Sequence, residues 1–290
     1  TDFFEAALAN GINAFDTARV YMEAEHSFGN WLEKSGRREE VVILSKCGHP
    51  DAMWNKRVNE KEMRKDLKKS LEELKTDYID IYMLHRDDPD TDVAVAVETF
   101  NAMHEEGSIR AFGASNWMHT RIEEANEYAY KHNLIPFSVS SPNFCLARQI
   151  EDPWGGGCVN ISGPENQEAR AWYEKNQMPV IAYASLGRGF FSGRMKSEYA
   201  DHASDYLDSF AMTGYACSDN FERLHRCEII AERHGVTVAQ IAMNWIFSHP
   251  LNIFAIASMS KADRMKANRE ALLLQLSDEE IAYLDLETPE

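Results

Sequence analysis

The sequence lacks the patterns that would connect it to a membrane or to nucleic acid. No apolar stretch in its 290 residues approaches the ~20 residues of a membrane span, and no basic segment followed by an apolar run opens the chain. Basic residues are few: 30 Lys and Arg stand against 47 Asp and Glu, a net charge of −17. Because nucleic acid and anionic membranes require a basic surface, this balance argues against both partners.

Cysteine is also scarce, and no CxxC pair or zinc-ligand spacing occurs. The five cysteines are widely separated: Cys47, Cys145, Cys158, Cys217 and Cys227. We therefore expect free thiols, a cytoplasmic location and no metal site. A chain of this length buries roughly three quarters of its unfolded surface, so it needs neither disulfides nor metal to fold.

Short apolar segments alternate with amphipathic helices along the chain. The segments are near-continuous hydrophobic runs, which is typical of parallel strands covered by helices. They comprise residues 12–18, 41–47, 79–86, 109–116, 137–144, 180–187 and 253–260. The alternation predicts βαβ units and hence a parallel sheet, for which an α/β barrel is one possible architecture. No change in composition divides the chain, so we expect one domain over residues 1–290.

Sequence signals at helix ends support this alternation. Asn59 with Glu62 predicts an N-cap and a capping box, and Ser277 with Glu280 predicts the start of a last helix. Further helices are expected near residues 93–106 and 219–234. Two segments do not follow this alternation, residues 145–168 and 188–218. We expect them to form long loops over the mouth of a barrel.

Most of the predicted strands end in a polar residue that a buried strand does not need: Asp16, Lys46, His85, Ser115 with Asn116, and Asn143. Each has an ordinary explanation by itself, such as a turn cap, a surface lysine or a core histidine. Because the carboxyl ends of parallel barrel strands converge on one face, their joint occurrence indicates a functional site there.

These residues lie in segments that resemble the aldo-keto reductases. Residues 11–18 read GINAFDTA, with Tyr21 five residues after Asp16, and residues 80–85 read DIYMLH. The resemblance extends over residues 113–116, 182–186 and 260–268. It implies a (β/α)8 TIM barrel and an NADP-dependent oxidoreductase that reduces an aldehyde or ketone to the alcohol.

The resemblance assigns catalysis to Asp16, Tyr21, Lys46 and His85. Hydride arriving at a carbonyl carbon creates an alkoxide that needs a proton, which Tyr21 can supply. A free phenol has a pKa near 10, and the ammonium of Lys46 favours the phenolate. Asp16 is expected to hold Lys46 in place, while His85 orients the carbonyl and relays the proton.

The hydride must come from a cofactor, because no side chain donates one. No GxGxxG follows a strand, since Gly187-Arg188-Gly189 is followed by Gly193, one residue too late. The resemblance instead implies NADP(H) bound by Ser115, Asn116, Tyr183, Leu186, Gly187, Arg188, Gly189, Ser258, Ser260, Lys261, Arg264 and Asn268. Lys261 and Arg264 would provide positive charge for a 2′-phosphate.

The chain departs from the family pattern at three cofactor positions. It reads SVSS over residues 138–141, where many members have a glutamine. It has Ala267 before Asn268, and Ala257-Ser258 where Pro-Gly is common. These departures affect the expected affinity and cofactor preference more than the expected reaction.

The substrate is less defined. Candidate pocket residues are Trp54, Arg86, Trp117, Phe144 and Trp154, which suit a sugar-like or small aryl carbonyl, although the tryptophans could equally pack the loops. The acidic run from Asp87 to Asp92 lacks the glycine and terminal glutamate of a calcium loop, so we expect a solvated turn around Pro89.

Two alternatives remain open. A cofactor-binding regulatory module of the same fold would show little turnover. A Schiff-base aldolase would use Lys46 as its nucleophile, although a lysine paired with Asp16 should be charged and therefore a poor nucleophile.

Only seven barrel strands can be read, and residues 1–10 resemble the helix that follows the first strand of such a barrel. We therefore expect the first strand to be absent from this chain, and the chain to be part of a longer polypeptide with a further segment or fused domain before Thr1.

Overall fold

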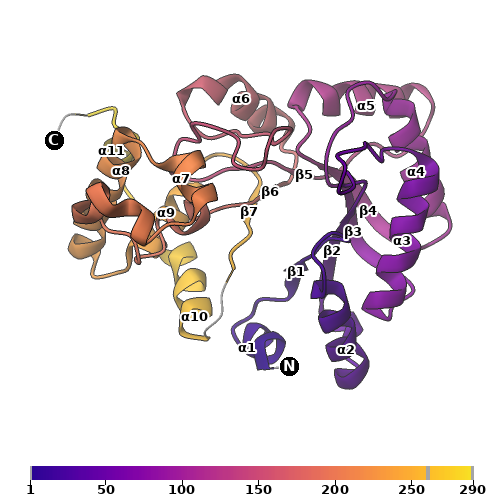
Figure 1. Ribbon diagram of the computed structural model, residues 1–290, viewed down its shortest axis with the longest axis horizontal. Helices are drawn as coiled ribbons and strands as arrows, with labels where there is room; N and C mark the ends of the chain where they lie inside the picture. The colour runs from indigo at the N-terminus through magenta and orange to yellow at the C-terminus, as the bar shows by residue number, and fades with distance from the viewer. Residues whose placement is uncertain (1, 259–261, 289–290) are drawn as a thin grey trace. The chain divides into compact units, whose positions relative to one another are not determined.

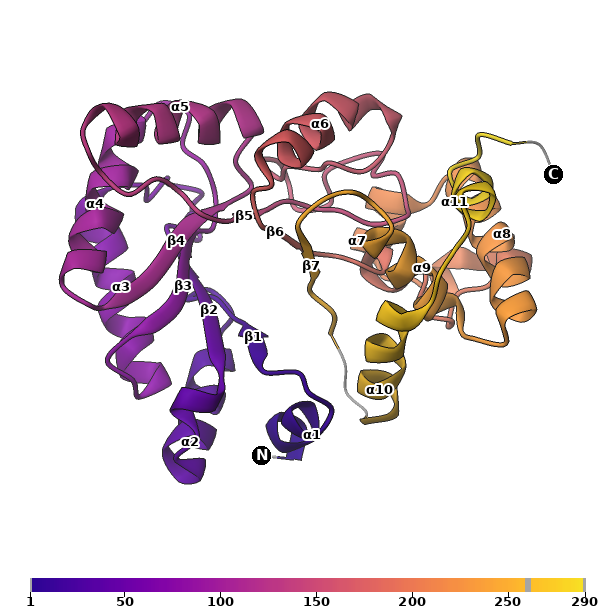
Figure 2. The same cartoon turned by 180° about the vertical axis from the view of Figure 1, so that it is seen from behind.

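The computed structural model describes residues 2–258 and 262–288. Its contacts group into two compact units, Thr1–Ser141 and Pro142–Glu290. Each unit is described by itself, so one domain over residues 1–290 stays a prediction. Figures 1 and 2 show the elements of both units from opposite sides.

The first unit is built on a parallel sheet whose strands follow one another in chain order. The strands are β1 (Ala14–Asp16), β2 (Val42–Cys47), β3 (Ile79–Leu84), β4 (Ile109–Ser115) and β5 (Ser140–Ser141). Ile43, Tyr82 and Met83 are fully buried. This is the near-continuous burial expected of parallel strands covered by helices, so the strand type read from the sequence is confirmed.

Helices connect and cover these strands (Figure 1). They are α1 (Asp2–Ala9), α2 (Ala24–Ser35), α3 (Glu60–Leu74), α4 (Val93–Glu105) and α5 (His119–Lys131), with a 3-10 turn η1 (Arg38–Glu40). Helix α3 packs on β2 and α4 packs on β4, while α2 contacts α3 and α4 contacts α5. At Gly29 of α2 an added Cβ would lie 2.0 Å from the carbonyl oxygen of Glu73. The close approach of α2 to the end of α3 therefore requires glycine.

The cap of α3 is only half of the predicted capping box. The Asn59 side chain accepts a hydrogen bond from the backbone N–H of Glu62 at 3.0 Å, as expected. The carboxylate of Glu62, however, binds the Arg57 guanidinium at 2.8 Å. The prediction of a full box is wrong because a charged partner is available to Glu62, and a charge-assisted bond is stronger than one to a neutral N–H.

The second unit contains two paired parallel strands, β6 (Val180–Ala182) and β7 (Ile253–Ala255). Its helices are α6 (Gln167–Asn176), α7 (Ser209–Tyr215), α8 (Ser218–His234), α9 (Val238–Phe247), α10 (Ala262–Glu270) and α11 (Asp278–Leu284). Its 3-10 segments are η2 (Pro164–Asn166), η3 (Gly187–Gly189), η4 (Ser197–Asp205) and η5 (Ala271–Leu273). The predicted capping box of Ser277 and Glu280 is present at α11.

Four strands are shorter than the apolar runs suggest. The run 12–18 contributes only β1. The run 137–144 contributes only β5, and Pro142, which has no N–H to donate to a ladder, follows it directly. The run 180–187 ends as a strand at Ala182, because Ala184 adopts a positive φ of 54° and a turn begins there. The run 253–260 ends as a strand at Ala255.

The segment 188–218 is largely helical and is not the long loop we expected, since it contains η4 and α7. Asp208 caps α7 by accepting a hydrogen bond from the backbone N–H of Ala211 at 2.8 Å. The Gly, Ser and Asp content that suggested a loop therefore marks helix boundaries. Within the described residues the chain forms seven strands in all, the number read from the sequence.

None of the helices in residues 2–258 and 262–288 is long and apolar enough to cross a membrane. The same residues include no group of three or more His, Cys, Asp and Glu side chains that could hold a metal ion.

Candidate active site

Four of the polar residues singled out in the sequence lie at the carboxyl ends of neighbouring strands in the first unit. Asp16 ends β1, Lys46 lies near the end of β2, His85 follows β3, and Ser115 ends β4. Parallel strands in chain order bring these ends to one edge of the sheet, which is where α/β folds place their chemistry.

Lys46 is held at this edge as a buried cation. Its side chain is 3% exposed, and its ammonium contacts the carboxylate of Asp16 and donates to the carbonyl oxygen of Thr17 at 2.9 Å. A buried ammonium needs such partners to remain charged. Burial raises the pKa of Asp16 from its usual value, and the attraction of Lys46 opposes that shift.

Tyr21 lies over this ion pair, on the turn that follows β1. The centre of its ring is 5.3 Å from the Lys46 nitrogen, and its ring meets that of His85 edge-on with 5.5 Å between centres. Its side chain is 42% exposed, in contrast to the buried lysine beneath it. The structure thus brings together the four residues predicted to be catalytic, with the tyrosine facing outward.

His85 is buried and neutral at neutral pH. The backbone N–H of His85 donates to the Cys47 carbonyl oxygen at 2.8 Å. The backbone carbonyl oxygen of His85 accepts a bond from the Asn116 side-chain amide at 3.1 Å. Burial holds the pKa of its ring well below 6.5, and the nearby Lys46, His49 and Arg86 lower it further. A neutral imidazole keeps one nitrogen as a donor and the other as an acceptor.

Ser115 and Asn116 tie neighbouring strand ends together. The Ser115 hydroxyl donates to the Ser141 carbonyl oxygen at 2.9 Å, and the Asn116 amide also donates to the Ser115 hydroxyl at 3.1 Å. Asn116 adopts a positive φ of 61°, a conformation that asparagine tolerates better than most residues. Both side chains are therefore held rigidly at the edge that carries Lys46 and His85.

The turn that carries Tyr21 is anchored by a carboxylate that the sequence reading missed. Glu25, in the first turn of α2, is 1% exposed; it contacts the guanidinium of Arg19 and accepts a hydrogen bond from Ser45 at 2.7 Å. The backbone N–H of Arg19 also donates to the Lys46 carbonyl oxygen at 3.0 Å. A signal was available: Glu25 falls three residues before Phe28 on the apolar face of α2, where an ordinary surface glutamate would not lie.

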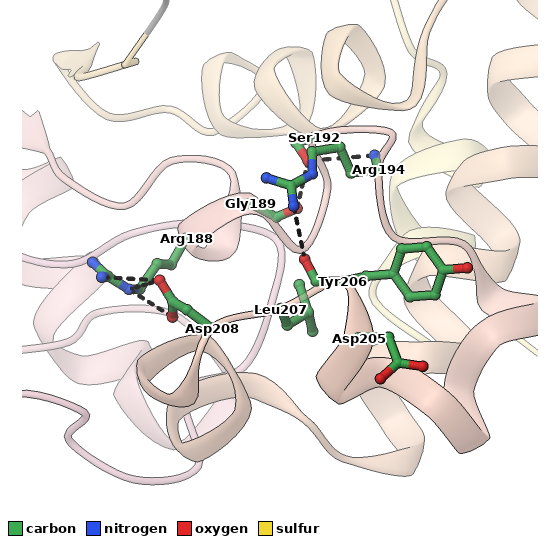
Figure 3. A pocket seen from close by; sticks show the side chains of 8 residues that line it. All are labelled: Arg188, Gly189, Ser192, Arg194, Asp205, Tyr206, Leu207 and Asp208. Atoms are coloured by element: carbon green, nitrogen blue, oxygen red, sulfur yellow. Dashed lines mark hydrogen bonds and ion pairs between the residues drawn. The ribbon is translucent and has the colours of Figure 1, made fainter.

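In the second unit, Leu186–Gly189 form a tight turn next to a small cavity (Figure 3). The Arg188 side chain binds Asp208 at 3.0 Å, and its guanidinium stacks on Trp154 at 4.5 Å. The cavity measures about 250 Å³. Its lining includes Arg188, Gly189, Ser192, Arg194 and Asp208. Tyr183 is half-buried at the end of β6.

The tail residues are only partly described. Ser258 and Arg264 are exposed, and Asn268 is half-buried in α10. Ser260 and Lys261 lie outside the described residues.

The residues proposed for the substrate pocket differ in their exposure to solvent. Trp54 is 58% exposed at the tip of a turn, where its backbone N–H donates to the Asp51 carbonyl oxygen. Arg86 is buried directly after His85, and Trp154 is half-buried under Arg188. Trp117 and Phe144 belong to the hydrophobic core of their units and are at most 1% exposed. The expectation that these two line a pocket is corrected: Trp117 packs on Phe137, and Phe144 packs on Trp245.

The acidic turn around Pro89 is less solvated than expected. Asp88 is 8% exposed, and its carboxylate accepts hydrogen bonds from Lys56 at 2.6 Å and from the Thr91 hydroxyl at 2.8 Å. Asp92 caps α4 by accepting a bond from the backbone N–H of Ala94. Asp88 and Asp92 therefore fix the start of α4, whereas the side chain of Asp90 is 91% exposed, as expected for a solvated turn.

Comparison with known proteins gives one family. The aldo/keto reductase family model matches residues 1–286. An aldo-keto reductase of Strobilurus tenacellus is 25% identical over 283 residues, covering 96% of this chain and 77% of the relative. The protein Tas of Escherichia coli strain K12 is 28% identical over 312 residues, covering 96% of this chain and 86% of the relative.

Two further matches agree with that family. An aryl-alcohol dehydrogenase of Pestalotiopsis microspora is 26% identical over 286 residues, covering 95% of this chain and 68% of the relative. The crystal structure of the thermostable aldo-keto reductase Tm1743 with the inhibitor epalrestat is 24% identical, with a TM-score of 0.71, and the match covers 98% of this chain and 85% of that one. The structural likeness shows that the fold is shared.

Proposed function

The chain belongs to the aldo/keto reductase family, and on this premise we propose that it reduces an aldehyde or ketone to the alcohol with NADPH, with Tyr21 as the proton donor. The family's activity is NAD(P)H-dependent carbonyl reduction, so the protein is an oxidoreductase. The proposal concerns the residues that act, the preference for NADPH and the substrate class.

The observation that carries the proposal is the buried Lys46–Asp16 pair beneath an exposed Tyr21. As Tyr21 gives its proton to the carbonyl oxygen, the ammonium 5.3 Å from its ring stabilises the phenolate that remains. Because Asp16 holds this ammonium, the positive charge stays in place through the reaction. The neutral ring of His85 next to Tyr21 can donate a hydrogen bond to the carbonyl oxygen and orient it.

Each unit, taken by itself, offers residues suited to one part of a dinucleotide. Bound NADPH would supply the hydride that no side chain provides. Ser115 and Asn116 lie at the catalytic edge of the first unit, where a carboxamide could bind. Arg188 and Arg194 line the cavity beside the turn of residues 186–189 and could bind phosphate oxygens. The exposed Arg264 supports NADPH over NADH.

The exposed side chains near the catalytic edge favour an aryl carbonyl over a sugar-like one. Met22 follows Tyr21 and is 84% exposed, and Met53 and Trp54, on the turn after β2, are 83% and 58% exposed. These are apolar or polarizable groups that contact aromatic rings well and offer few hydrogen bonds to hydroxyls. The relative named as an aryl-alcohol dehydrogenase agrees with this preference.

The finer architecture also stays a proposal. The fold match over 98% of the chain supports a single domain of the (β/α)8 type over residues 1–290. The free cysteines support a cytoplasmic location.

The test compares the wild type with Tyr21→Phe. NADPH oxidation is followed through the loss of the absorbance of the reduced cofactor, with matched panels of aryl and sugar-derived aldehydes as substrates. We expect the wild type to turn over, with aryl aldehydes preferred, and Tyr21→Phe to lose activity about a thousandfold while binding NADPH as tightly as the wild type. Preserved turnover in Tyr21→Phe would refute the role given to Tyr21.

Two other outcomes would point to the alternatives. NADPH binding without turnover on any carbonyl would favour the regulatory module. A covalent adduct trapped on Lys46 by borohydride in the presence of substrate would favour the aldolase.

A further inference from the structure

The ring of His85 is held in place by other rings. The side chain is 8% exposed, and within the described residues its Nδ1 atom has no hydrogen-bond partner. Its ring contacts are Tyr21 at 5.5 Å and His49 at 4.9 Å, both edge-on. A catalytic histidine usually has its tautomer and orientation set by a hydrogen bond to the nitrogen that does not act. Within the described residues Nδ1 has no such bond, which leaves the orientation of the ring to its packing contacts.

His49 is itself anchored by bonds of its own. Its Nδ1 lies 2.9 Å from the Pro50 carbonyl oxygen, so this nitrogen carries the proton, and the neutral ring leaves Nε2 without one. Its carbonyl oxygen accepts a bond from the Arg57 guanidinium at 3.2 Å. Arg57 in turn binds Asp66 at 2.7 Å, and Asp66 accepts a bond from the backbone N–H of Gly48 at 3.0 Å. The turn carrying His49 is thus clamped to α3.

The charges around the two rings are mostly positive. Arg86 and Lys46 lie close to His85, and Arg86 and Arg57 lie close to His49, where only Asp66 acts in the opposite direction. A proton on His49 would therefore add a further cation to a half-buried, cationic neighbourhood. Burial, together with Arg86 and Arg57, lowers the pKa of His49 below 6.5, while the Pro50 carbonyl and Asp66 oppose the shift.

We propose that His49 is a positioning residue: its neutral ring holds the ring of His85 against Tyr21, and protonation of His49 loosens that contact and so lowers turnover at acid pH. The effect on turnover rests on the proposed function. The coupling between the two rings does not, and it can be measured without any substrate.

Nuclear magnetic resonance of 15N-labelled histidine tests the coupling directly. The His85 resonances are assigned by their loss in His85→Gln and are followed from about pH 8 to pH 5. In the wild type we expect them to shift at the midpoint at which His49 titrates, although His85 itself stays neutral. In His49→Phe, which keeps an aromatic ring at the position but cannot titrate, that shift should vanish. A His85 resonance with the same pH response in both proteins would overturn the proposal.

Steady-state kinetics tests the consequence. In His49→Ala, which removes the ring, we expect kcat to fall about tenfold or more at pH 7.5, because small misplacements of a catalytic group are costly. His49→Phe should recover part of that loss, and its kcat should decline at lower pH than in the wild type. A residue of merely structural importance would lower thermal stability but would not move the pH profile.

His132 provides the matched control. Its ring also packs on an aromatic neighbour, Tyr128, at 4.2 Å, but at the far end of α5. His132→Ala should leave kcat, the pH profile and the His85 resonances unchanged. If coupling is seen by resonance while no carbonyl is turned over, the proposed function fails and the positioning contact stands. If turnover is normal and His49→Ala matches the wild type in kcat and pH profile, the positioning role fails alone.

Discussion

Replacing Glu25 should disturb the position of the proposed proton donor, Tyr21, while the rest of the fold stays in place. Glu25 anchors the turn between β1 and α2 that carries Tyr21, through Arg19 on the turn and Ser45 on the neighbouring strand. Glu25→Gln keeps the shape of the side chain and an oxygen for the Ser45 hydroxyl. It removes the negative charge that Arg19 requires.

The expected loss of unfolding free energy follows from the burial of the Glu25–Arg19 ion pair. Removing one partner of a buried ion pair costs about 3–5 kcal/mol, because the remaining charge is left without compensation. The side chain of Arg19 is 19% exposed and retains some contact with water, so we expect the lower end, about 3 kcal/mol. Tyr21 lies two residues from Arg19. A displacement of about 1 Å at a reacting group can cost a hundredfold in rate, so kcat should fall at least about tenfold.

The assay is urea unfolding of the wild type and Glu25→Gln, with kcat measured on the same preparations well below the unfolding transition. Glu60→Gln is the matched control, because Glu60 pairs with Arg64 on α3 with its side chain 64% exposed, and exposed pairs contribute little. The control should match the wild type in both measurements. A Glu25→Gln protein with unchanged kcat and unfolding free energy would show that the turn is held by other contacts.

Two further predictions concern titration and thiol reactivity. Because burial holds the pKa of His85 below 6.5, the unfolded chain binds the proton first on acidification, so the unfolding free energy should fall from about pH 7 to pH 5, and fall less in His85→Gln. Equal slopes would contradict this reasoning. A thiol reagent followed by mass spectrometry should label the half-buried Cys158 and Cys217 in the native protein; burial raises the pKa of the other thiols, that of Cys145 to about 12. Native labelling of Cys47 would be inconsistent with its burial.

The strand types and the meeting of Asp16, Lys46 and His85 could be predicted because both depend on local pattern. An apolar run that ends in a polar residue is visible in the chain itself, and parallel strands in chain order place those ends on one edge. Tyr21 could be added through its spacing from Asp16 and the family resemblance, since the turn it lies on has no periodic pattern.

Other features could not be predicted, because they depend on how side chains and strands pack in three dimensions. Trp117 directly follows Asn116 in sequence, yet its ring turns into the core against Phe137, and nothing in the linear pattern predicts this difference. The run 137–144 has the composition of a long strand, but only β5 forms, because the pairing of a strand depends on neighbours distant in sequence.

Glu25 and His49 are further residues whose contacts could not be predicted from the sequence, and both lie next to the candidate site. The sequence points to the groups that would exchange protons, Tyr21 and His85, and to the Lys46–Asp16 pair that stabilises them. Tyr21 is exposed and His85 lacks a hydrogen bond at Nδ1 within the described residues, so neither is fixed by the sheet alone. We expect their positions to depend on two neighbouring residues, Glu25 of α2 through Arg19 and His49 through its ring. Because these residues act through charge and packing, replacing either should disturb turnover more than NADPH binding, which the proposed function assigns to other residues.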